Sequence, residues 1–516
     1  MNKKYAIKMA SNQAMSAALL TPAEMARADA LTIAAGTPGI LLMERAAAAI
    51  VEAIEAAFPD AVRVACLAGP GNNGGDAWAA AAILQRRGRA VAVFRLQPPE
   101  KLSGDAAIAA QAFGNEGAPL AAFRPEAFDL VVDGLFGAGL SRALEGEVAG
   151  MVDRLNADPV PVLSIDLPSG ISGLTGERLG MAVTATATVT FFRAKPGHWL
   201  EPGRSHCGSV TVADIGIAPV VLDAIGPRTF ANEPALWRDQ LRTPADAGHK
   251  YDRGHAVVVS GGAAQTGAAR LAATAALRGG AGLVTVLSPS SAVLVNATHL
   301  TAVMLKRCDD RATLTELLGD RRLNALVLGP GFGVGAQARD YAEAVLASEA
   351  RLVLDADGIT SFAEDPAALF ALAAQAADRR TKGEAAMVLT PHAGEFKRLF
   401  PDLAAADAMA KPETARQAAA RARSIVLLKG RDTVIAAPDG RAAINTTGTP
   451  WLATAGSGDV LSGLVAAALA QGAATFEAAC AAVWMHGKAA EMFGPGLIAE
   501  DLPAMLPKVF ARLAAG

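Results

Sequence analysis

The sequence of residues 61–76 is AVRVACLAGPGNNGGD. Its first half is a short apolar run, which predicts a buried β-strand, and a helical pattern follows the loop from Asp76 to Arg87. A strand, a glycine-rich loop and a helix in this order are typical of parallel α/β proteins, in which the free amides of the helix can hold a phosphate. The loop is neither GxGxxG nor a Walker loop, so a tight turn that serves only packing is the alternative.

The same alternation continues on both sides of this stretch. Residues 21–24, TPAE, predict a capped helix start, and residues 40–58 predict a second helix. Further strands are predicted at 90–96, 130–132 and 160–165, and Thr/Val-rich strands at 182–192 and 209–215 are expected to form the edge of the sheet. This pattern predicts a parallel sheet that is covered by helices on both faces.

A second alternating region follows a poorly patterned connection at 232–245. It predicts a helix at 267–278 and strands at 255–260, 283–287, 325–328, 351–354, 386–389, 424–428 and 433–437. Because single hydrophobic cores stop growing near about 250 to 300 residues, a chain of 516 residues is expected to form at least two domains. We predict an α/β protein with domains at 1–235 and 236–516.

Composition excludes several classes of function. With 52% hydrophobic residues the chain has ample material for packed cores, and 47 basic against 50 acidic residues leave no electrostatic footprint for nucleic acid. No apolar run approaches the roughly 18 residues of a membrane helix, so we expect neither nucleic acid nor a membrane as a partner. The four cysteines form no CxxC pair, which predicts buried thiols in a reducing compartment and a cytoplasmic protein.

Two carboxylates follow predicted strands of the first half. Asp133 leads into the glycine-containing stretch 134–140, and Asp166 lies in the turn 164–170. Since parallel sheets bind ligands at the carboxyl ends of their strands, both aspartates and the loop at 69–76 are expected at one crevice. Each aspartate taken alone is more simply explained as a helix cap.

The second half contains a comparable phosphate motif. Residues 454–459, TAGSGD, precede the apolar helix 460–470, so backbone amides could cradle a phosphate with Asp459 beside it as a base. The turn Lys429–Thr433 could add nucleotide contacts, and His392 follows another strand. The simpler alternatives are a tight turn with an Asp cap, a solvated Lys/Arg turn and a structural histidine.

Together these motifs resemble the bifunctional enzymes that join an NAD(P)H-hydrate epimerase to an ADP-dependent NAD(P)H-hydrate dehydratase. The resemblance covers nearly the whole chain and rests on residues 41–45, 69–76, 133–139, 166–170, 279–284, 329–333, 391–395 and 455–463. It implies a Rossmann-like epimerase domain at 1–235 and a ribokinase-like dehydratase domain at 236–516.

The resemblance also implies binding sites. In the first domain the residues that match the family's substrate site are Asn72, Asn73, Gly74, Gly75, Asp76, Gly137, Ala138, Gly139, Leu140, Ser141, Arg142, Ala143 and Asp166. The positions that match its potassium site are Asn73, Asp133 and Ser169. In the second domain the hydrate positions are Ala268, Gly331, His392 and Asp459, and the nucleotide positions are Lys429, Gly430, Arg431, Asp432, Thr433 and Gly458. Magnesium is expected with the nucleotide.

The implied activity is repair of hydrated NADH and NADPH. The first domain would interconvert the R and S hydrates, and the second would dehydrate the S form with ADP, or ATP, as co-substrate. Asp459 is expected to act as the base for dehydration and Asp166 as the acid/base group for epimerisation, with a pKa raised by partial burial. The alternative for Asp166 is hydrogen bonding to the substrate alone. We also expect a homo-oligomer, whose size the sequence does not define.

Two competing functions follow from the same residues. Ribokinase-like folds commonly phosphorylate small molecules, so the second half could belong to a vitamin kinase. The first half could be a binding module without catalysis, since binding and catalytic sites use the same residue types.

Overall fold

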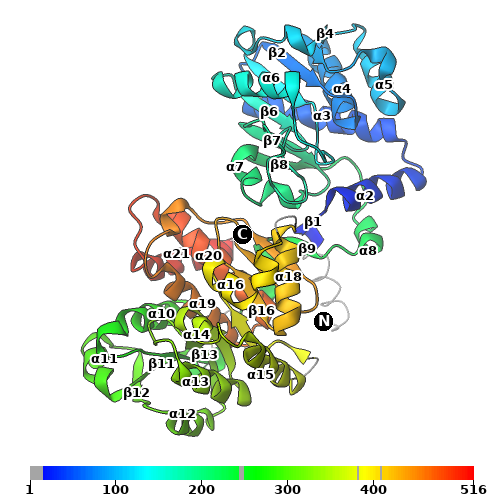
Figure 1. Cartoon of the computed structure of the whole chain (residues 1–516). Helices are drawn as coiled ribbons and strands as arrows, with labels where there is room; N and C mark the ends of the chain where they lie inside the picture. Colours follow the sequence, from blue (N-terminus) through cyan, green and yellow to red (C-terminus); the bar gives the residue numbers. More distant parts are fainter. Residues whose placement is uncertain (1–14, 243–248, 381–382, 407–408, 516) are drawn as a thin grey trace. The chain divides into compact units, whose positions relative to one another are not determined.

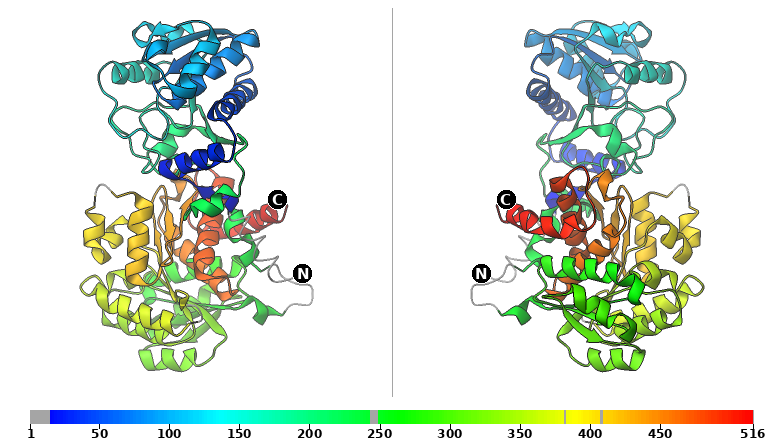
Figure 2. Two further views of the ribbon diagram at one scale, coloured as in Figure 1. Left: turned by 90° about the vertical axis from the view of Figure 1, so that its right-hand side faces the viewer. Right: turned by 90° about the vertical axis from the view of Figure 1, so that its left-hand side faces the viewer.

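The computed structural model describes residues 15–242, 249–380, 383–406 and 409–515 (Figure 1). The described residues divide into two compact units, which are described separately below: a first unit, residues 18–229, and a second unit, which contains the described residues from 230 onward together with 15–17. Both units are α/β, with mainly parallel sheets that carry helices on both faces (Figures 1 and 2). The expected fold class is therefore confirmed.

The units part at residue 229, before the boundary of 235/236 that the sequence predicts. Residues 232–242, predicted as a connection, contain the helix α9 (Pro234–Trp237) and the 3-10 turn η5 (Arg238–Gln240). The buried indole of Trp237 donates a hydrogen bond to the side chain of Asn232 at 3.1 Å, which ties this stretch to the second unit. The remaining part of the predicted connection, 243–245, lies outside the described residues.

The sheet of the first unit has seven strands in the order β4-β3-β2-β5-β6-β7-β8, and all neighbours are parallel. Its strands are β2 (Arg63–Ala68), β3 (Ala90–Arg95), β4 (Ala118–Pro119), β5 (Leu130–Gly134), β6 (Val162–Ile165), β7 (Ala187–Phe191) and β8 (Ser209–Ala213). The predicted edge at β7 and β8 is confirmed. The strand order reverses direction between β2 and β5, and such a switch point opens a crevice at the carboxyl ends of the strands.

The helices of the first unit begin largely where the sequence signals place them. They are α2 (Pro22–Ala34), α3 (Gly39–Ala57), α4 (Asn72–Arg86), α5 (Gly104–Phe113), α6 (Gly146–Ala157), α7 (Gly203–Cys207) and α8 (Val221–Ile225); the short strand β1 (Ala18–Leu19) precedes them. The capping box of α2 is present, since the Thr21 hydroxyl accepts from the Glu24 amide at 3.2 Å and the Glu24 carboxylate accepts from the Thr21 amide at 2.8 Å. Helix α4 starts at Asn72 rather than at the predicted Asp76, so the whole NNGG sequence forms its first turn.

The sheet of the second unit runs in the order β9-β18-β17-β16-β15-β14-β13-β10-β11-β12. Its strands are β9 (Thr229–Asn232), β10 (His255–Val259), β11 (Leu283–Ser288), β12 (Met304–Arg307), β13 (Leu323–Leu328), β14 (Arg351–Leu354), β15 (Met387–Leu389), β16 (Ile425–Leu428), β17 (Val434–Ala436) and β18 (Ala442–Asn445). From β16 to β12 all neighbours are parallel, whereas β17 pairs antiparallel with both β16 and β18. The switch point of this sheet lies between β10 and β13.

Helices cover both faces of this second sheet (Figure 2). They are α9, α10 (Thr266–Arg278), α11 (Val293–His299), α12 (Arg311–Leu318), α13 (Ala336–Ala347), α14 (Ala356–Thr360), α15 (Pro366–Asp378), α16 (Ala393–Leu399), α17 (Pro401–Ala404), α18 (Lys411–Ala422), α19 (Ser457–Ala470), α20 (Thr475–Phe493) and α21 (Asp501–Ala515). Helices α10, α19 and α20 bury small and branched side chains against one face of the sheet.

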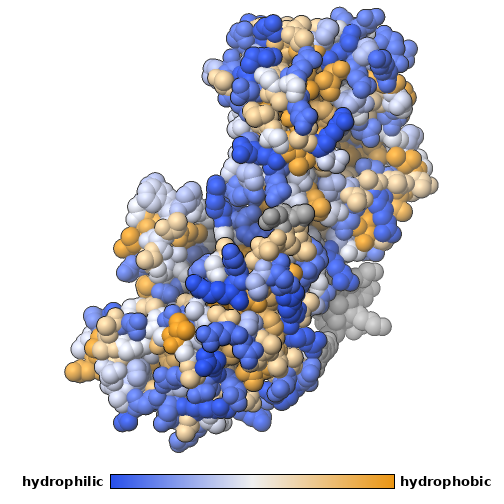
Figure 3. Space-filling view, in the orientation of Figure 1, coloured by the Kyte–Doolittle hydropathy of each residue, from blue (hydrophilic) through white to orange (hydrophobic). Residues whose placement is uncertain are grey.

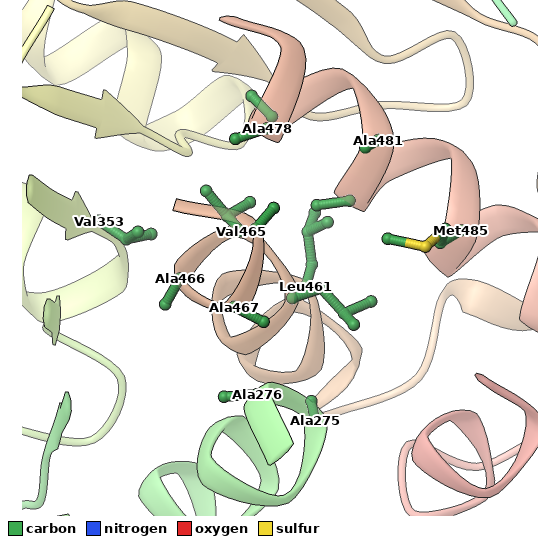
Figure 4. Packing of buried hydrophobic residues seen from close by; sticks show 14 of the residues in the cluster. Ala275, Ala276, Val353, Leu461, Val465, Ala466, Ala467, Ala478, Ala481 and Met485 are labelled. Carbon is green, nitrogen blue, oxygen red and sulfur yellow. The ribbon is translucent and has the colours of Figure 1, made fainter. Parts of the chain in front are cut away.

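Helix α19 is the centre of this core. Figure 4 shows Leu461 and Val465 of α19 between Ala275 of α10 and Ala481 of α20. The backbones of α10 and α19 approach so closely that a Cβ on Gly463 would lie 2.1 Å from a carbonyl oxygen of α10. This packing fixes the axis of α19, and with it the position of the turn at its N-terminus.

The visible surface is of mixed character, and the predicted burial of the cysteines is confirmed. Figure 3 shows hydrophilic residues spread over the visible face of both units, with apolar residues scattered among them. All four cysteines are buried free thiols. Within the described ranges, no helix combines the length and apolar character needed to cross a membrane.

Candidate active sites

A pocket of about 570 Å³ lies in the first unit at the switch point between β2 and β5. Of the residues that the sequence assigns to substrate, those that line it are Asn72, Asn73, Asp76, Gly137, Ala138, Gly139, Leu140, Ser141, Arg142 and Asp166. The three predicted turns therefore do meet at one crevice. Helices α2 and α3 contribute the opposite wall, which includes Asp29 and Met43.

Three of the predicted substrate residues do not line this pocket: Gly74, Gly75 and Ala143. Gly74 and Gly75 are buried in the first turn of α4. A Cβ on Gly74 would lie 1.9 Å from the carbonyl oxygen of Gly69, so this glycine lets the helix start directly against the preceding loop. The role of this pair in the described fold is thus close packing that brings Asn72, Asn73 and Asp76 to the pocket.

Asp166 is held rigidly at the floor of the pocket. One carboxylate oxygen, Oδ1, accepts from the Lys195 ammonium at 2.6 Å and from the Thr190 hydroxyl at 3.0 Å. The other oxygen, Oδ2, accepts from the Ala138 amide at 2.8 Å. The Lys195 side chain is only 2% exposed, so the ion pair is shielded from water.

This ion pair overturns one expectation about Asp166. Burial alone would raise the pKa of its carboxyl, but the adjacent Lys195 charge and hydrogen bond outweigh burial and lower the pKa to about 2. The predicted rise toward neutral pH is therefore wrong. The reason is Lys195, which follows β7 in the sequence FFRAKPGH and which no motif singled out.

His198 fixes the backbone of this aspartate. Its Nε2–H donates to the Asp166 carbonyl at 2.7 Å, and its Nδ1 accepts from the Lys195 amide at 2.9 Å. Burial lowers the pKa of His198 to about 4, so the ring is neutral at physiological pH. Asp166 has a φ of 63°, which a non-glycine residue adopts only when its surroundings impose it, and the His198 contact is one of those constraints.

Beneath the pocket lies a group of oxygen atoms that contains the predicted potassium positions. Asp133 is completely buried, and its carboxylate accepts from the Ser169 amide at 2.9 Å and the Ser169 hydroxyl at 2.6 Å. The Ser169 hydroxyl also lies 3.1 Å from the Phe136 carbonyl. The Nδ2 atom of Asn73 is buried without a hydrogen-bond partner. Burial raises the pKa of Asp133, and no basic side chain among the described residues pairs with it.

In the second unit, the predicted residues follow parallel strands that lie side by side. Gly331 follows β13, His392 follows β15 and Lys429 follows β16, and Asp355, for which no role was predicted, follows β14 between them. The loops touch one another, since the Lys429 amide donates to the carbonyl of the residue before His392 at 2.9 Å. A Cβ on Gly331 would lie 3.5 Å from the Cβ of Ala268 on α10. The four predicted strand ends therefore form one edge.

The phosphate turn lies at this edge. Gly456 has a φ of 85°, a left-handed conformation that glycine adopts freely, and it is the N-cap of α19. Behind the turn, Asp355 accepts from the Lys429 ammonium at 2.9 Å and from the Ser462 hydroxyl at 2.7 Å. Burial, reinforced by the negative charge of Asp355 and opposed by Lys429, raises the pKa of Asp459 to about 6. Asp459 is thus a base that is ionised at neutral pH.

Several predicted contacts of the second site also have structural roles. His392 is the N-cap of α16, where its Nδ1 accepts from the Gly394 amide at 2.9 Å. The hydroxyl of Thr433 donates to the Gly430 carbonyl at 2.9 Å and closes the turn. Asp432 forms an ion pair with Lys411 at 2.5 Å, so its carboxylate points into the protein. Arg431 is exposed on the same turn, and Gly458 lies in the first turn of α19.

Comparisons with known proteins match both units. The family described as NAD(P)H-hydrate dehydratase matches residues 256–508, and the family described as YjeF-related protein N-terminus matches residues 40–197. The bifunctional NAD(P)H-hydrate repair enzyme Nnr of Moorella thermoacetica is 36% identical over 96% of this chain and 97% of its own length. The enzyme of the same name from Gloeobacter violaceus is 38% identical over 92% of this chain and 93% of its own length.

A solved structure is also similar to the second unit. It is the ADP/ATP-dependent NAD(P)H-hydrate dehydratase from Bacillus subtilis co-crystallised with ATP and Mg²⁺, 27% identical, covering 55% of this chain and 98% of that one with a TM-score of 0.47. The full-length relatives decide the assignment, because they match both halves of the chain in one alignment. The resemblance predicted from the motifs is confirmed: this chain belongs to the family of bifunctional NAD(P)H-hydrate repair enzymes.

Proposed function

We propose that the pocket of the first unit interconverts the R and S hydrates of NADH and NADPH, and that the site at the N-terminus of α19 dehydrates the S hydrate with ADP or ATP. The observation that carries this proposal is the match of the whole chain to bifunctional repair enzymes. It is supported by the pocket at the switch point of the first sheet, and by the predicted residues that follow the neighbouring strands β13 to β16 of the second.

Dehydration would begin with Asp459. Its carboxylate takes the proton of the C6 hydroxyl, whose oxygen then attacks the terminal phosphoryl group of the nucleotide and displaces AMP from ADP, or ADP from ATP. The C6–O bond breaks with release of phosphate, pushed by the lone pair of the ring nitrogen, and loss of a C5 proton restores the dihydronicotinamide. The amides of the turn at Gly456 and the Lys429 ammonium would stabilise the phosphoryl charge.

The residues of this edge fit a nucleotide that brings its own magnesium. Within the described residues no cluster of three or more acidic, histidine or cysteine side chains could enclose a metal. Magnesium usually keeps several waters and binds one or two carboxylates together with substrate phosphates, so an enclosed site is not required. Bound there, the ion would neutralise charge on the phosphates, while Asp355 holds Lys429 in place.

Epimerisation would proceed by opening and closing the carbinolamine at C6. Ring opening exchanges a proton at the hydroxyl and at the ring nitrogen, and rotation before closure inverts C6. Asp166, held ionised by Lys195, would accept a hydrogen bond from the hydrate and orient it. Arg142 and the N-terminal amides of α4 line the pocket where the anionic diphosphate would lie.

Potassium is a further part of this proposal. Asn73, Asp133 and Ser169 offer amide, carboxylate and hydroxyl oxygens, which suit a hard cation. Among the described residues the buried Asp133 carboxylate has no basic partner, which fits a site in which a cation supplies the balancing charge. The cation would offset the charge of the substrate diphosphate nearby.

The alternative of a vitamin kinase with a non-catalytic first half is not supported by the full-length relatives. We further propose that the protein is a cytoplasmic homo-oligomer. Four free buried thiols fit a reducing compartment. Light scattering of the purified chain would give its oligomeric state.

The proposed function is tested with mixed hydrate epimers and ADP, then ATP, while the dihydronicotinamide absorbance is followed. Both epimers should be consumed and inorganic phosphate should appear in equal amount. Consumption of the S hydrate alone would reject the epimerase assignment, and phosphorylated hydrate as the final product would favour a kinase.

A further inference from the structure

The pocket of the first unit contains a carboxylate that the proposed function does not use, that of Asp29. It lies on α2 and lines the same pocket as Asp76 and Asp166. Among the residues that the structure describes, no hydrogen bond or ion pair engages its side chain. A partly buried carboxylate without donors inside a ligand pocket is free to bond to what the pocket binds.

The carboxylate of Asp166, unlike that of Asp29, already has hydrogen-bond donors. Three donors from the Lys195 ammonium, the Thr190 hydroxyl and the Ala138 amide already occupy its oxygens. Taking up a proton would break the ion pair with Lys195, and the low pKa of about 2 expresses that cost. Asp166 can therefore orient a substrate, but it is poorly suited to carry a proton near neutral pH.

The surroundings of Asp29 and Asp76 suit the first carboxyl group to act as a base and the second as an acid. Burial raises the pKa of Asp29 to about 6, with Lys195 lowering it and Asp166 raising it. Burial and the charges of Asp166 and Asp29 raise the pKa of Asp76 well above its ordinary value. At neutral pH Asp29 is mainly ionised, whereas the raised pKa of Asp76 favours its protonated form. Carboxyl groups separated in this way are the usual sign of an acid/base pair.

We infer that Asp29 takes the proton of the C6 hydroxyl, and that Asp76 gives a proton to the ring nitrogen, when the hydrate ring opens. This inference rests on the proposed epimerase function of the pocket. The electron pair left on the oxygen forms the aldehyde C=O while the C6–N1 bond breaks. The electrons of that bond move to N1, which takes the proton from Asp76. After rotation about C5–C6, N1 returns its proton to Asp76 and attacks the aldehyde, whose oxygen recovers the proton from Asp29. The cycle consumes no reagent.

The inference predicts a pH dependence for epimerisation. The charged groups that face Asp29 are Lys195 after β7, Asp166 after β6 and Asp76 on α4; Asp105 and Arg142 also line the pocket. Because the base acts when ionised, the rate should be full above pH 6 and should fall as the pH drops through about 6. It should fall again at high pH, when Asp76 loses its proton.

The test uses Asp29→Asn in the full chain, with Asp153→Asn as a matched control on the exposed face of α6. Mixed hydrate epimers and ADP are supplied, and the two epimers are followed separately by chromatography. We expect loss of R conversion by on the order of 100-fold or more in Asp29→Asn. Dehydration of the S hydrate should stay unchanged in both variants, and the acid limb near pH 6 should be absent from any residual rate.

The outcomes separate the inference from the function on which it rests. R conversion at the wild-type rate in Asp29→Asn would overturn the role of Asp29 alone. A wild-type chain that consumes S and leaves R would overturn the epimerase function and this inference with it. Should Asp29→Asn fail to unfold cooperatively, the pH profile of R–S exchange by the wild-type chain without nucleotide decides: an acid limb near pH 6 supports the inference, and a flat profile between about pH 5 and 8 contradicts it.

Discussion

The two sites are built on the same structural device and use it for different chemistry. Each lies at the carboxyl ends of parallel strands, at the switch point between β2 and β5 in the first unit and along β13 to β16 in the second. In the first, carboxyl groups with widely separated pKa values surround a buried lysine. In the second, a glycine turn at a helix N-terminus stands beside Lys429 and a single base. The strand order places the site, and the charged groups around it decide the reaction.

The contrast extends to how each lysine is used. Lys195 is buried and its charge is consumed in holding Asp166 ionised, whereas the Lys429 side chain, 22% exposed, is positioned by Asp355 but can still meet a phosphate. Lys195 keeps Asp166 ionised in the first pocket, whereas Lys429 is available to bind the nucleotide phosphate in the second site. The predictions below test whether the two sites are as separate as this comparison implies.

The largest expected effect is on dehydration. Asp459→Asn removes the base while keeping its shape, so dehydration should fall by on the order of 10³-fold or more. Nucleotide binding, measured by calorimetry, should remain because the amides and Lys429 are untouched. Epimerisation should continue, and the R and S hydrates should exchange without being consumed. Dehydration near the wild-type rate would show that another group takes the proton.

The matching change in the first unit is Asp166→Asn. It leaves the buried Lys195 ammonium without its counter-charge and removes a substrate contact, so the R hydrate should persist while the S hydrate is still dehydrated. Removing a negative neighbour should also lower the pKa of Asp29, which moves the acid limb of any residual epimerisation below pH 6. Unchanged conversion of R would exclude a role for Asp166.

Potassium should distinguish the sites by affecting only one of them. Replacing it with a bulky organic cation should slow epimerisation by on the order of 10-fold and leave dehydration of pure S hydrate unchanged. Wild-type protein should also melt at a higher temperature as potassium is added, because binding stabilises the folded state. In Asp133→Ala, potassium should change neither the rate of epimerisation nor the melting temperature. A potassium response that survives in this variant would place the cation elsewhere.

The smallest expected effect is a shift in a pH profile. Asp355→Asn removes a negative charge beside Asp459 and releases Lys429 from its partner, and both changes lower the pKa of Asp459. The base then stays ionised to lower pH, so the acid limb of dehydration should move from near 6 to lower pH, by up to about one pH unit. A shift of this acid limb to higher pH would contradict the effects assigned to Asp355 and Lys429 on the pKa of Asp459.

The sequence predicted the strand ends better than the groups that meet there. Buried strands with glycine-rich ends are visible in stretches such as 61–76, because the pattern and the function lie in the same residues. Strand β12 was not predicted because it is largely exposed and carries Lys306 and Arg307, so it shows no buried apolar run. Asp29 and Lys195 were not predicted because no local motif surrounds them, and Asp166, the partner of Lys195, lies far from it in sequence. The pKa of Asp166 could not be predicted without Lys195.

The central claim is that each unit carries one complete reaction, and mixing two single variants tests it most directly. Asp459→Asn should epimerise without dehydrating, and Asp166→Asn should consume S and leave R. An equimolar mixture of the two with ADP should convert both epimers completely, because the S hydrate formed on one chain can diffuse to the other. If the mixture leaves the R hydrate unconverted although each chain is folded, the two reactions are not divided between the units as described.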